Sequence, residues 1–144
     1  MRIKTAYLAG LAAFVVTAIV SHRTPTPYNN YVLLADAWLH GHAWVSIPGN
    51  YIDALPFGGH YYIIEAPMPA VLLLPLVAAF GLAANQTFLA MLLCGVAVGA
   101  AWELGERIGL TPSATAWICV FLLAGTDLMW CAMLGDVWFI AHVS

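Results

Sequence analysis

Hydrophobic residues are gathered into four long runs, and the stretches between them hold most of the polar and charged side chains. The runs cover residues 5–21, 67–84, 86–108 and 113–132. A helix needs about 20 apolar residues to cross the hydrocarbon core of a bilayer. Each run approaches that length. The pattern therefore predicts an all-α integral membrane protein with three or four transmembrane helices.

The run 67–84 differs from the other three because it contains Pro67, Pro69 and Pro75. Each proline removes a backbone hydrogen-bond donor, and in lipid such a defect needs a protein or water partner. We therefore expect a short juxtamembrane helix here rather than a regular span.

The order of charges favours one orientation. Arg2 and Lys4 place the N-terminus in the cytoplasm by the positive-inside rule. Residues 22–85 then form an external loop with helices at about 29–40 and 67–84, while 86–108 runs inward and leaves Arg107 in the cytoplasm. We expect a multi-pass protein of the cytoplasmic (inner) membrane.

Two further expectations concern the ends of the chain. The first run also fits a secretory signal peptide, with a cut after Ala18; we favour an uncleaved anchor because more apolar runs follow. Residues 136–144 open a further apolar element, so we expect the chain to be the N-terminal part of a longer protein.

Composition agrees with a membrane protein. Of the 144 residues, 63% are hydrophobic and 8% are charged, with a net charge of −3. Basic residues form no cluster that would suit nucleic acid. Cys94, Cys119 and Cys131 lie within or beside apolar runs, and we expect them to be packing residues rather than a disulfide frame or a zinc site.

The run 86–108 carries its own packing signal. Gly95 and Gly99 form a G-x-x-x-G pattern, which lets another helix approach closely. Glu103 and Arg107 continue the same stripe and are spaced to form a pair along the helix.

The helix expected at about 29–40 places Asn29, Asp36 and His40 on one face. The opposite side consists of Tyr31, Leu34 and Trp38, and it is expected to face the membrane. One interpretation is an interfacial helix with its polar stripe toward solvent. The other is that the stripe faces an external active site, with Asp36 as a base or metal ligand and His40 as its partner.

Residues 50–62 predict a β-hairpin that turns at Gly58-Gly59. Asp53 lies before the turn and Glu65 after it, so the hairpin would bring both acids to the same mouth. Paired acids can position a metal or remove a proton from a hydroxyl nucleophile. Alternatively, Asp53 caps a turn and Glu65 marks the membrane edge.

The histidines offer a weaker signal for a metal site. His40-Gly41-His42, with His60 later, lacks the spacing of a zinc motif. Carboxylates that hold Mg²⁺ or Mn²⁺ against a phosphate fit these oxygen-rich surroundings better.

The order of motifs resembles the N-terminal portion of polyprenyl-phosphate-dependent membrane glycosyltransferases of the GT-C class, of the glycosyltransferase family 39 or dolichyl-phosphate-mannose mannosyltransferase-like type. Four features carry the resemblance: the segment from Pro27 to Gly41, Asp53 followed by Gly59-His60-Tyr61-Tyr62, the proline-broken run from Ala66 to Gly81, and the segment from Gly135 to His142.

The resemblance implies a hexosyltransferase that moves a sugar from a polyprenyl-phosphate carrier to an acceptor on the outer side of the membrane, often with a divalent ion. An external-loop carboxylate would act as general base. The acidic residues usual after the first span are replaced here by Asn29-Asn30, which leaves Asp53 or Asp36 as the base. The residues expected to bind substrate are Asn29, Asn30, His40, Tyr61, Tyr62, Glu65, Asp136 and His142.

Two other classes of function remain open. A transporter subunit would need polar residues along several spans, and the runs here are almost purely apolar. A non-catalytic or truncated membrane interaction protein, anchored through surfaces such as Gly95 and Gly99, is the second alternative.

Overall fold

The structure is a computed structural model, and it describes residues 5–21, 26–46 and 53–144. Arg2 and Lys4, on which the orientation of the chain was predicted, lie outside the described residues. The elements are α1 (Thr5–Val20), α2 (Asn30–Leu39), β1 (Ala54–Phe57), β2 (His60–Ile63), α3 (Met68–Phe80), the 3₁₀ turn η1 (Gly81–Ala83), α4 (Gln86–Arg107), α5 (Pro112–Ala124), α6 (Leu128–Leu134) and α7 (Val137–Val143).

Helix dominates the described residues, as the sequence predicts. Seven helices and the 3₁₀ turn make up about 70% of the described residues, and the predicted hairpin supplies the two strands. By length and apolar composition, one described helix, α4, could cross a membrane. A second candidate arises if the bent pair α5 and α6 counts as one span, whereas α1 and α3 are shorter apolar helices.

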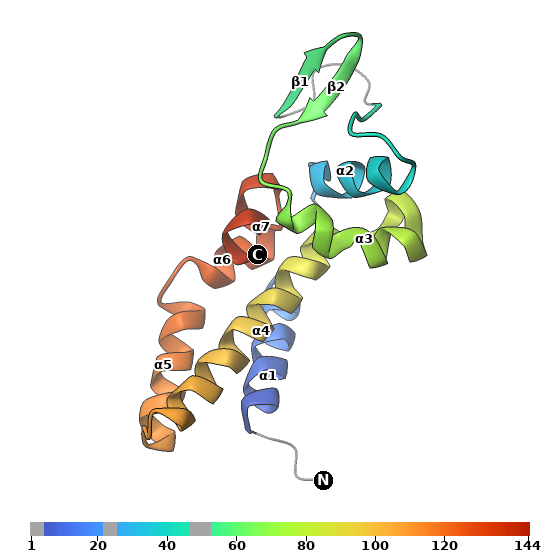
Figure 1. Cartoon of the computed structure of the whole chain (residues 1–144). Helices are drawn as coiled ribbons and strands as arrows, with labels where there is room; N and C mark the ends of the chain where they lie inside the picture. Colours follow the sequence, from blue (N-terminus) through green and yellow to red (C-terminus); the bar gives the residue numbers. More distant parts are fainter. Residues whose placement is uncertain (1–4, 22–25, 47–52) are drawn as a thin grey trace.

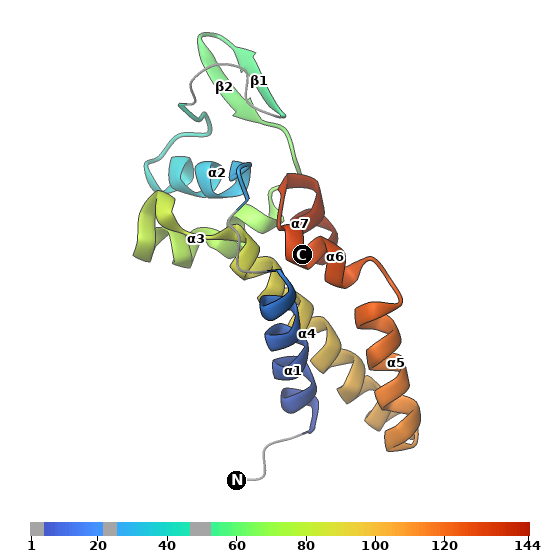
Figure 2. The ribbon, with the colours of Figure 1, turned by 180° about the vertical axis from the view of Figure 1, so that it is seen from behind.

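The long helices form a narrow bundle. Figures 1 and 2 show α1, α4 and α5 running lengthwise, with α2 and α3 lying across one end and the hairpin beyond them. The seam between α1 and α4 is built on glycines. A Cβ on Gly95 would lie 2.8 Å from the carbonyl oxygen of Gly10, and one on Gly99 would lie 3.1 Å from that of Ala6. The close helix approach predicted from Gly95 and Gly99 is therefore confirmed.

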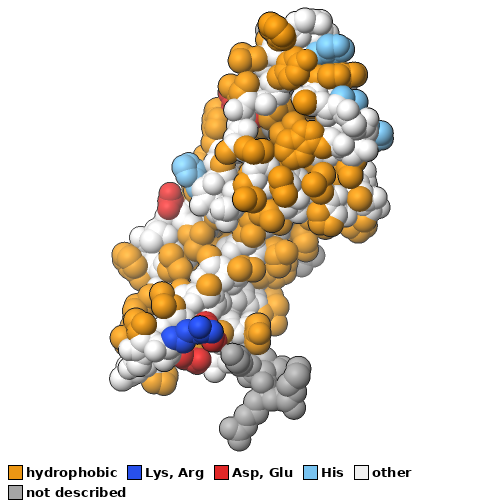
Figure 3. Space-filling view, in the orientation of Figure 1, with side chains coloured by type: hydrophobic (Ala, Val, Ile, Leu, Met, Phe, Trp, Pro, Cys, Tyr) orange, Lys and Arg blue, Asp and Glu red, His pale blue; other side chains and the backbone are white. Residues whose placement is uncertain are grey.

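Helix α1 buries its small side chains and exposes large apolar ones. Its buried residues are the small ones, Ala6, Gly10, Ala13 and Thr17. The large apolar side chains of Tyr7, Leu11 and Ile19 are 69%, 58% and 64% exposed. Small residues inside and large apolar residues outside are typical of helices that pack within lipid. Figure 3 shows hydrophobic side chains over most of the visible length of the molecule.

The apolar run 113–132 is not one straight helix. α5 begins at Pro112 after its N-cap Thr111, and it ends at Ala124. α6 then starts at Leu128, and the two helices are bent by 46°. Thr126 lies in the break, where its hydroxyl donates to the carbonyl of Leu122 and accepts from the amide of Leu128. Such local side-chain bonds compete with the helical ladder, so the prediction of a continuous helix was wrong.

α3 and α2 form a layer across the end of α1 and α4. α3 contains Pro75 within its length, and Figure 1 shows it lying crosswise to α4. Tyr31 and Leu34 of α2 are buried in a core cluster with Ala70, Leu73 and Val77 of α3. The prediction that this side of α2 faces the membrane was wrong, because α3 supplies its apolar partner.

The hairpin has the predicted turn. β1 and β2 are antiparallel, with Ala54 opposite Ile63 and Phe57 opposite His60, so the turn falls at Gly58-Gly59. Both glycines have positive φ, of 57° and 82°, as a tight hairpin turn requires.

Candidate functional site

A group of polar side chains lies where the base of the hairpin meets the first turn of α2. Because Ala54 pairs with Ile63, Asp53 and Glu65 flank the same end of the hairpin. The side-chain amide of Asn30, at the start of α2, donates to Oε1 of Glu65 at 3.2 Å. Tyr31 follows Asn30 and is fully buried. The structure thus brings together Asp53, Glu65 and Asn30, all predicted site residues, and adds Tyr31.

The charges of the two acids influence Tyr31, and the charge of Asp53 influences Glu65. Burial, followed by the charges of Glu65 and Asp53, raises the pKa of the Tyr31 hydroxyl to about 12. Burial is also the largest cause that raises the pKa of Glu65, with the charge of Asp53 adding to it and the hydrogen bond from Asn30 opposing it. Both effects follow from placing acids in a region of restricted solvation.

Three polar atoms of this group are buried without a hydrogen-bond partner: the Tyr31 hydroxyl, Oδ2 of Asp53 and Oε2 of Glu65. Asp53 also adopts a left-handed backbone conformation, with φ of 54°, and is the one non-glycine residue with positive φ among those described. Unsatisfied buried groups and uncommon backbone conformations are found more often at functional sites than elsewhere. We therefore take this group, Asn30, Tyr31, Asp53 and Glu65, as the candidate site and call it the acid cluster.

A second polar group anchors the segment that leads into α2. Gln86, fully buried at the start of α4, donates to the carbonyl oxygens of Tyr28 at 2.9 Å and Gly135 at 2.7 Å. The hydroxyl of Thr26 donates to Oδ1 of Asp136. These bonds tie residues 26–28 to α4 and to the turn between α6 and α7. Sequence reasoning missed Gln86, although the polar triplet Asn85-Gln86-Thr87 marks the point where the apolar runs 67–84 and 86–108 meet.

Asp36 and His40 lie elsewhere on α2, four residues apart. Nδ1 of His40 lies 3.6 Å from Oδ2 of Asp36 and 2.8 Å from its carbonyl oxygen, and the His40 side chain is 67% exposed. Asp36 and His40 are therefore close to each other, as their spacing on one helical face predicts. The pair joins an exposed histidine to a half-buried acid on one helix and is not part of the acid cluster.

Beyond the end of α2, aromatic and histidine rings form a column. The ring of Trp44 is stacked between His42, at 4.1 Å, and His60 of β2, at 4.3 Å. The amide of Val45 donates to the carbonyl of Tyr61 at 2.8 Å. Together these contacts fasten the segment after α2 to the hairpin, so they help to hold Asp53 and Glu65 over α2.

The other predicted binding residues are dispersed. Tyr61 and Tyr62 are half-buried on β2, where the ring of Tyr62 packs edge-on against Phe57. Asp136 is bound by Thr26, as described above, and His142 is exposed on the last turn of α7. Asn29 is the N-cap residue of α2, immediately before Asn30.

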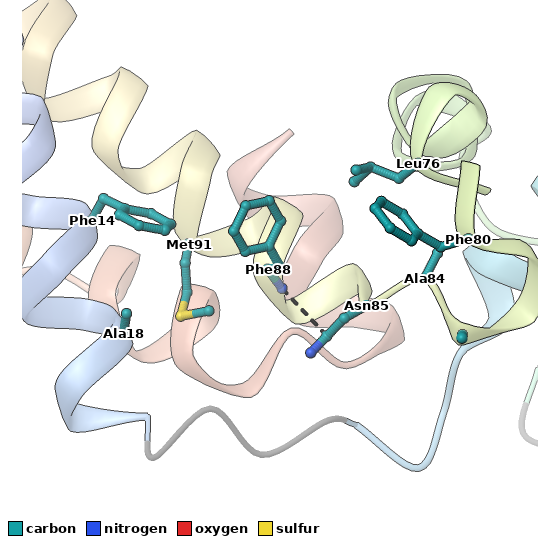
Figure 4. A pocket seen from close by; sticks show the side chains of 9 residues that line it. Phe14, Ala18, Leu76, Phe80, Ala84, Asn85, Phe88 and Met91 are labelled. Carbon is teal, nitrogen blue, oxygen red and sulfur yellow. Dashed lines mark hydrogen bonds between the residues drawn. The ribbon is translucent and has the colours of Figure 1, made fainter. Parts of the chain in front are cut away.

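An apolar recess of about 500 Å³ opens where α1, α3 and α4 meet. Figure 4 shows Leu76 and Phe80 from the α3 side facing Phe14 of α1 and Phe88 of α4 across it. Asn85 lies at its edge, where its side chain accepts hydrogen bonds from the amides of Thr87 and Phe88 and so caps α4. The recess is the right kind of surface for a hydrocarbon chain.

The described residues do not form a cage for a metal ion. No group of three or more His, Cys, Asp or Glu side chains within the described ranges is arranged to hold one. Asp53 and Glu65 are hard oxygen ligands, but two carboxylates alone leave most of the coordination shell of Mg²⁺ or Mn²⁺ to water or substrate.

The fold is thus a mostly helical bundle, capped by a crosswise helix pair and a hairpin. No protein-family model, curated protein or solved structure matches the chain.

Proposed function

We propose that this chain is the N-terminal part of a multi-pass inner-membrane hexosyltransferase. It would transfer a sugar from a polyprenyl-phosphate carrier to a hydroxyl acceptor, with Asp53 as the general base. The observation that carries the proposal is the meeting of Asp53 and Glu65 at the base of the hairpin, beside a fully buried Tyr31. Asn30, at the position where the resemblance puts an acid, donates to Glu65, which supports seeking the base among the hairpin acids.

Two features support a membrane setting. Helix α1 buries small side chains and exposes large apolar ones, and the surface of the bundle is apolar. In this proposal α1, α4 and the bent pair α5 and α6 cross the bilayer, while α3 lies along its outer surface. The hairpin then extends away from the membrane. Arg107 lies at the other end of α4, where its guanidinium bonds Glu103 at 3.1 Å as predicted, and would be cytoplasmic.

The proposed reaction needs one base and one leaving group. Oδ2 of Asp53 takes the proton of the acceptor hydroxyl as the oxygen bonds to the anomeric carbon. The bond from that carbon to the phosphate oxygen of the carrier breaks, and the polyprenyl phosphate leaves with the electron pair. The apolar recess between α1, α3 and α4 offers space for part of the carrier's hydrocarbon.

Replacing Asp53 with Asn tests the assignment in membranes from cells that express the protein. We expect transfer from a polyprenyl-phosphate sugar to fall by at least 100-fold, because loss of a general base typically costs about 10²–10⁴ in rate. Asp127→Asn, an exposed acid at the break between α5 and α6, is the matched control and should keep its activity. Retained transfer in Asp53→Asn, with loss in Asp36→Asn, would move the base to Asp36 and contradict the proposal.

A further inference from the structure

A long groove follows the seam between α1 and α4, next to the apolar recess described above. Its volume is about 770 Å³, within the range of roughly 300–1,000 Å³ that is usual for ligand sites. Phe14 and Phe88 line both the groove and the recess, and their rings meet edge to face at 5.8 Å. The groove therefore begins where the recess ends and follows α4 away from α3. We call it the seam groove.

The seam groove is hollow because small residues lie along its floor. Gly95 and Gly99 line it and are also the residues that bring α4 against the backbone of α1. Larger apolar side chains stand at its sides, among them Leu11 and Val96, which are 58% and 60% exposed. A trough with a smooth floor and apolar sides suits a flexible hydrocarbon chain.

One end of the seam groove carries two opposite charges. Glu103 and Arg107 both line it, and Nε and Nη2 of Arg107 donate to Oε1 of Glu103 at 3.1 Å. Arg107 is the one Lys or Arg among the described residues, and its side chain is 74% exposed. Figure 3 shows a positive patch beside acidic side chains at the end of the molecule opposite the hairpin. The groove thus combines an apolar trough with a cation and an anion at one mouth.

We propose that the seam groove binds a phosphatidylethanolamine of the cytoplasmic leaflet. This inference rests on the membrane setting of the proposed function, in which Arg107 is cytoplasmic. The lipid phosphate lies on Arg107, the ammonium donates to Glu103, and an acyl chain fills the trough. A guanidinium has five N–H donors and a carboxylate accepts about four hydrogen bonds, so both side chains can bind the headgroup while bonded to each other.

The length of the trough agrees with one leaflet. Val96 precedes Arg107 by eleven residues of α4, which is about 16 Å at about 1.5 Å per residue. The hydrocarbon core of a bilayer is about 30 Å thick, so an acyl chain that starts at Arg107 ends near Val96. The recess beside α3 then stays open to the carrier lipid.

Other occupants match the seam groove less completely. Phosphatidylglycerol supplies a phosphate but no cation for Glu103, and phosphatidylcholine supplies a cation that has no N–H donor. A second copy of this chain in a symmetric dimer would present the same surface, so two hollows would face each other unfilled. Ethanolamine matches both charges and donates hydrogen bonds.

Native mass spectrometry of the detergent-purified chain tests the headgroup. The two probes are phosphatidylethanolamine and phosphatidylcholine, both with palmitoyl and oleoyl chains. We expect the wild type to bind one ethanolamine lipid at least tenfold more tightly than the choline lipid. Glu103→Gln should abolish this preference, because the amide has one acceptor atom and no charge. Arg107→Gln should weaken the binding of both lipids at least fivefold, because both carry the phosphate.

Filling the trough tests the acyl-chain site. Ala100 is exposed and lines the seam groove, so Ala100→Phe should weaken binding of the ethanolamine lipid at least tenfold. Leu104→Phe is the matched control, since Leu104 lies one turn further along α4, is 58% exposed and is outside the groove lining. It should bind as the wild type does. Thermal unfolding followed by circular dichroism checks that both variants are folded, and Glu103→Gln decides the question if Ala100→Phe is not.

Two results would overturn the proposal. Equal affinity of the wild type for both lipids, or unchanged binding by a folded Ala100→Phe, would show lipid that coats α4 without a site. Disulfide cross-linking of two chains through Val96→Cys, without saturable lipid binding, would assign the groove to a second copy. Transfer is measured separately. A failed lipid preference in a protein that needs Asp53 for transfer would refute this site alone, and a selective lipid site with full transfer by Asp53→Asn would refute the proposed base alone.

Discussion

At the scale of single residues, the surroundings of Asp36 and Glu65 differ. Asp36 pairs with the exposed His40 on one face of α2, whereas Glu65 sits near Asp53 in a partly buried place that raises its pKa. A carboxyl group with a raised pKa binds its proton more tightly in the folded than in the unfolded protein. Folding is therefore favoured below the unfolded pKa of about 4.5, and this contribution is lost as the pH rises through the folded pKa.

Glu65→Gln should remove that pH dependence. We expect the Tm of the wild type to fall as the pH is raised above about 4.5, because ionised Glu65 then faces Asp53. The variant, which cannot ionise, should show a flatter profile and a higher Tm at neutral pH. Glu106→Gln is the control, since Glu106 is exposed and accepts a hydrogen bond from Trp102 that Gln can also accept. A Glu65→Gln profile that follows the wild type would mean that Glu65 is not perturbed.

At the scale of elements, the contact between α1 and α4 depends on the absence of side chains. Gly10 and Gly95 face each other so closely that a Cβ on either would lie within 2.8 Å of a carbonyl oxygen of the other helix. Backbone atoms in two packed helices cannot move aside as a flexible side chain can. The helices would have to separate, and their small-residue packing would be lost.

Gly95→Ala therefore should destabilise the bundle by about 1–3 kcal/mol, the usual cost of overpacking. The neighbouring Val96 is 60% exposed, and Val96→Ala should change stability by no more than about 0.5 kcal/mol. Reversible denaturant unfolding in mixed micelles measures both. Equal stabilities for the two variants would show that α1 and α4 do not pack through their glycines.

At the scale of the whole molecule, local patterns predicted the elements better than their partners. Glycine spacing correctly predicted the hairpin turn and the α1–α4 seam, because both depend on the backbone itself. The partner of the Tyr31 side of α2 was assigned to lipid instead of α3, since periodicity shows that a face is apolar but not what covers it. The break at Thr126 depends on local hydrogen bonds that hydropathy does not report.

The same limit applies to the acid cluster. Asp53 and Glu65 were predicted to meet because a hairpin joins them. Tyr31 was not predicted to join them, because the sequence does not show where α2 lies relative to the hairpin. Gln86 was missed for a similar reason: its two backbone acceptors, Tyr28 and Gly135, are far from it in sequence.

The central claim is that α4 crosses the membrane, with the hairpin on one side and Arg107 on the other, while α3 does not cross. Single cysteines at Phe57, Leu82 and Ile108, which are 77%, 57% and 63% exposed, test it in protein whose own cysteines are replaced by alanine. With a membrane-impermeant maleimide, we expect Phe57→Cys and Leu82→Cys to react from the periplasmic side and Ile108→Cys only from the cytoplasmic side. Labelling of Phe57→Cys and Ile108→Cys from the same side would contradict the account.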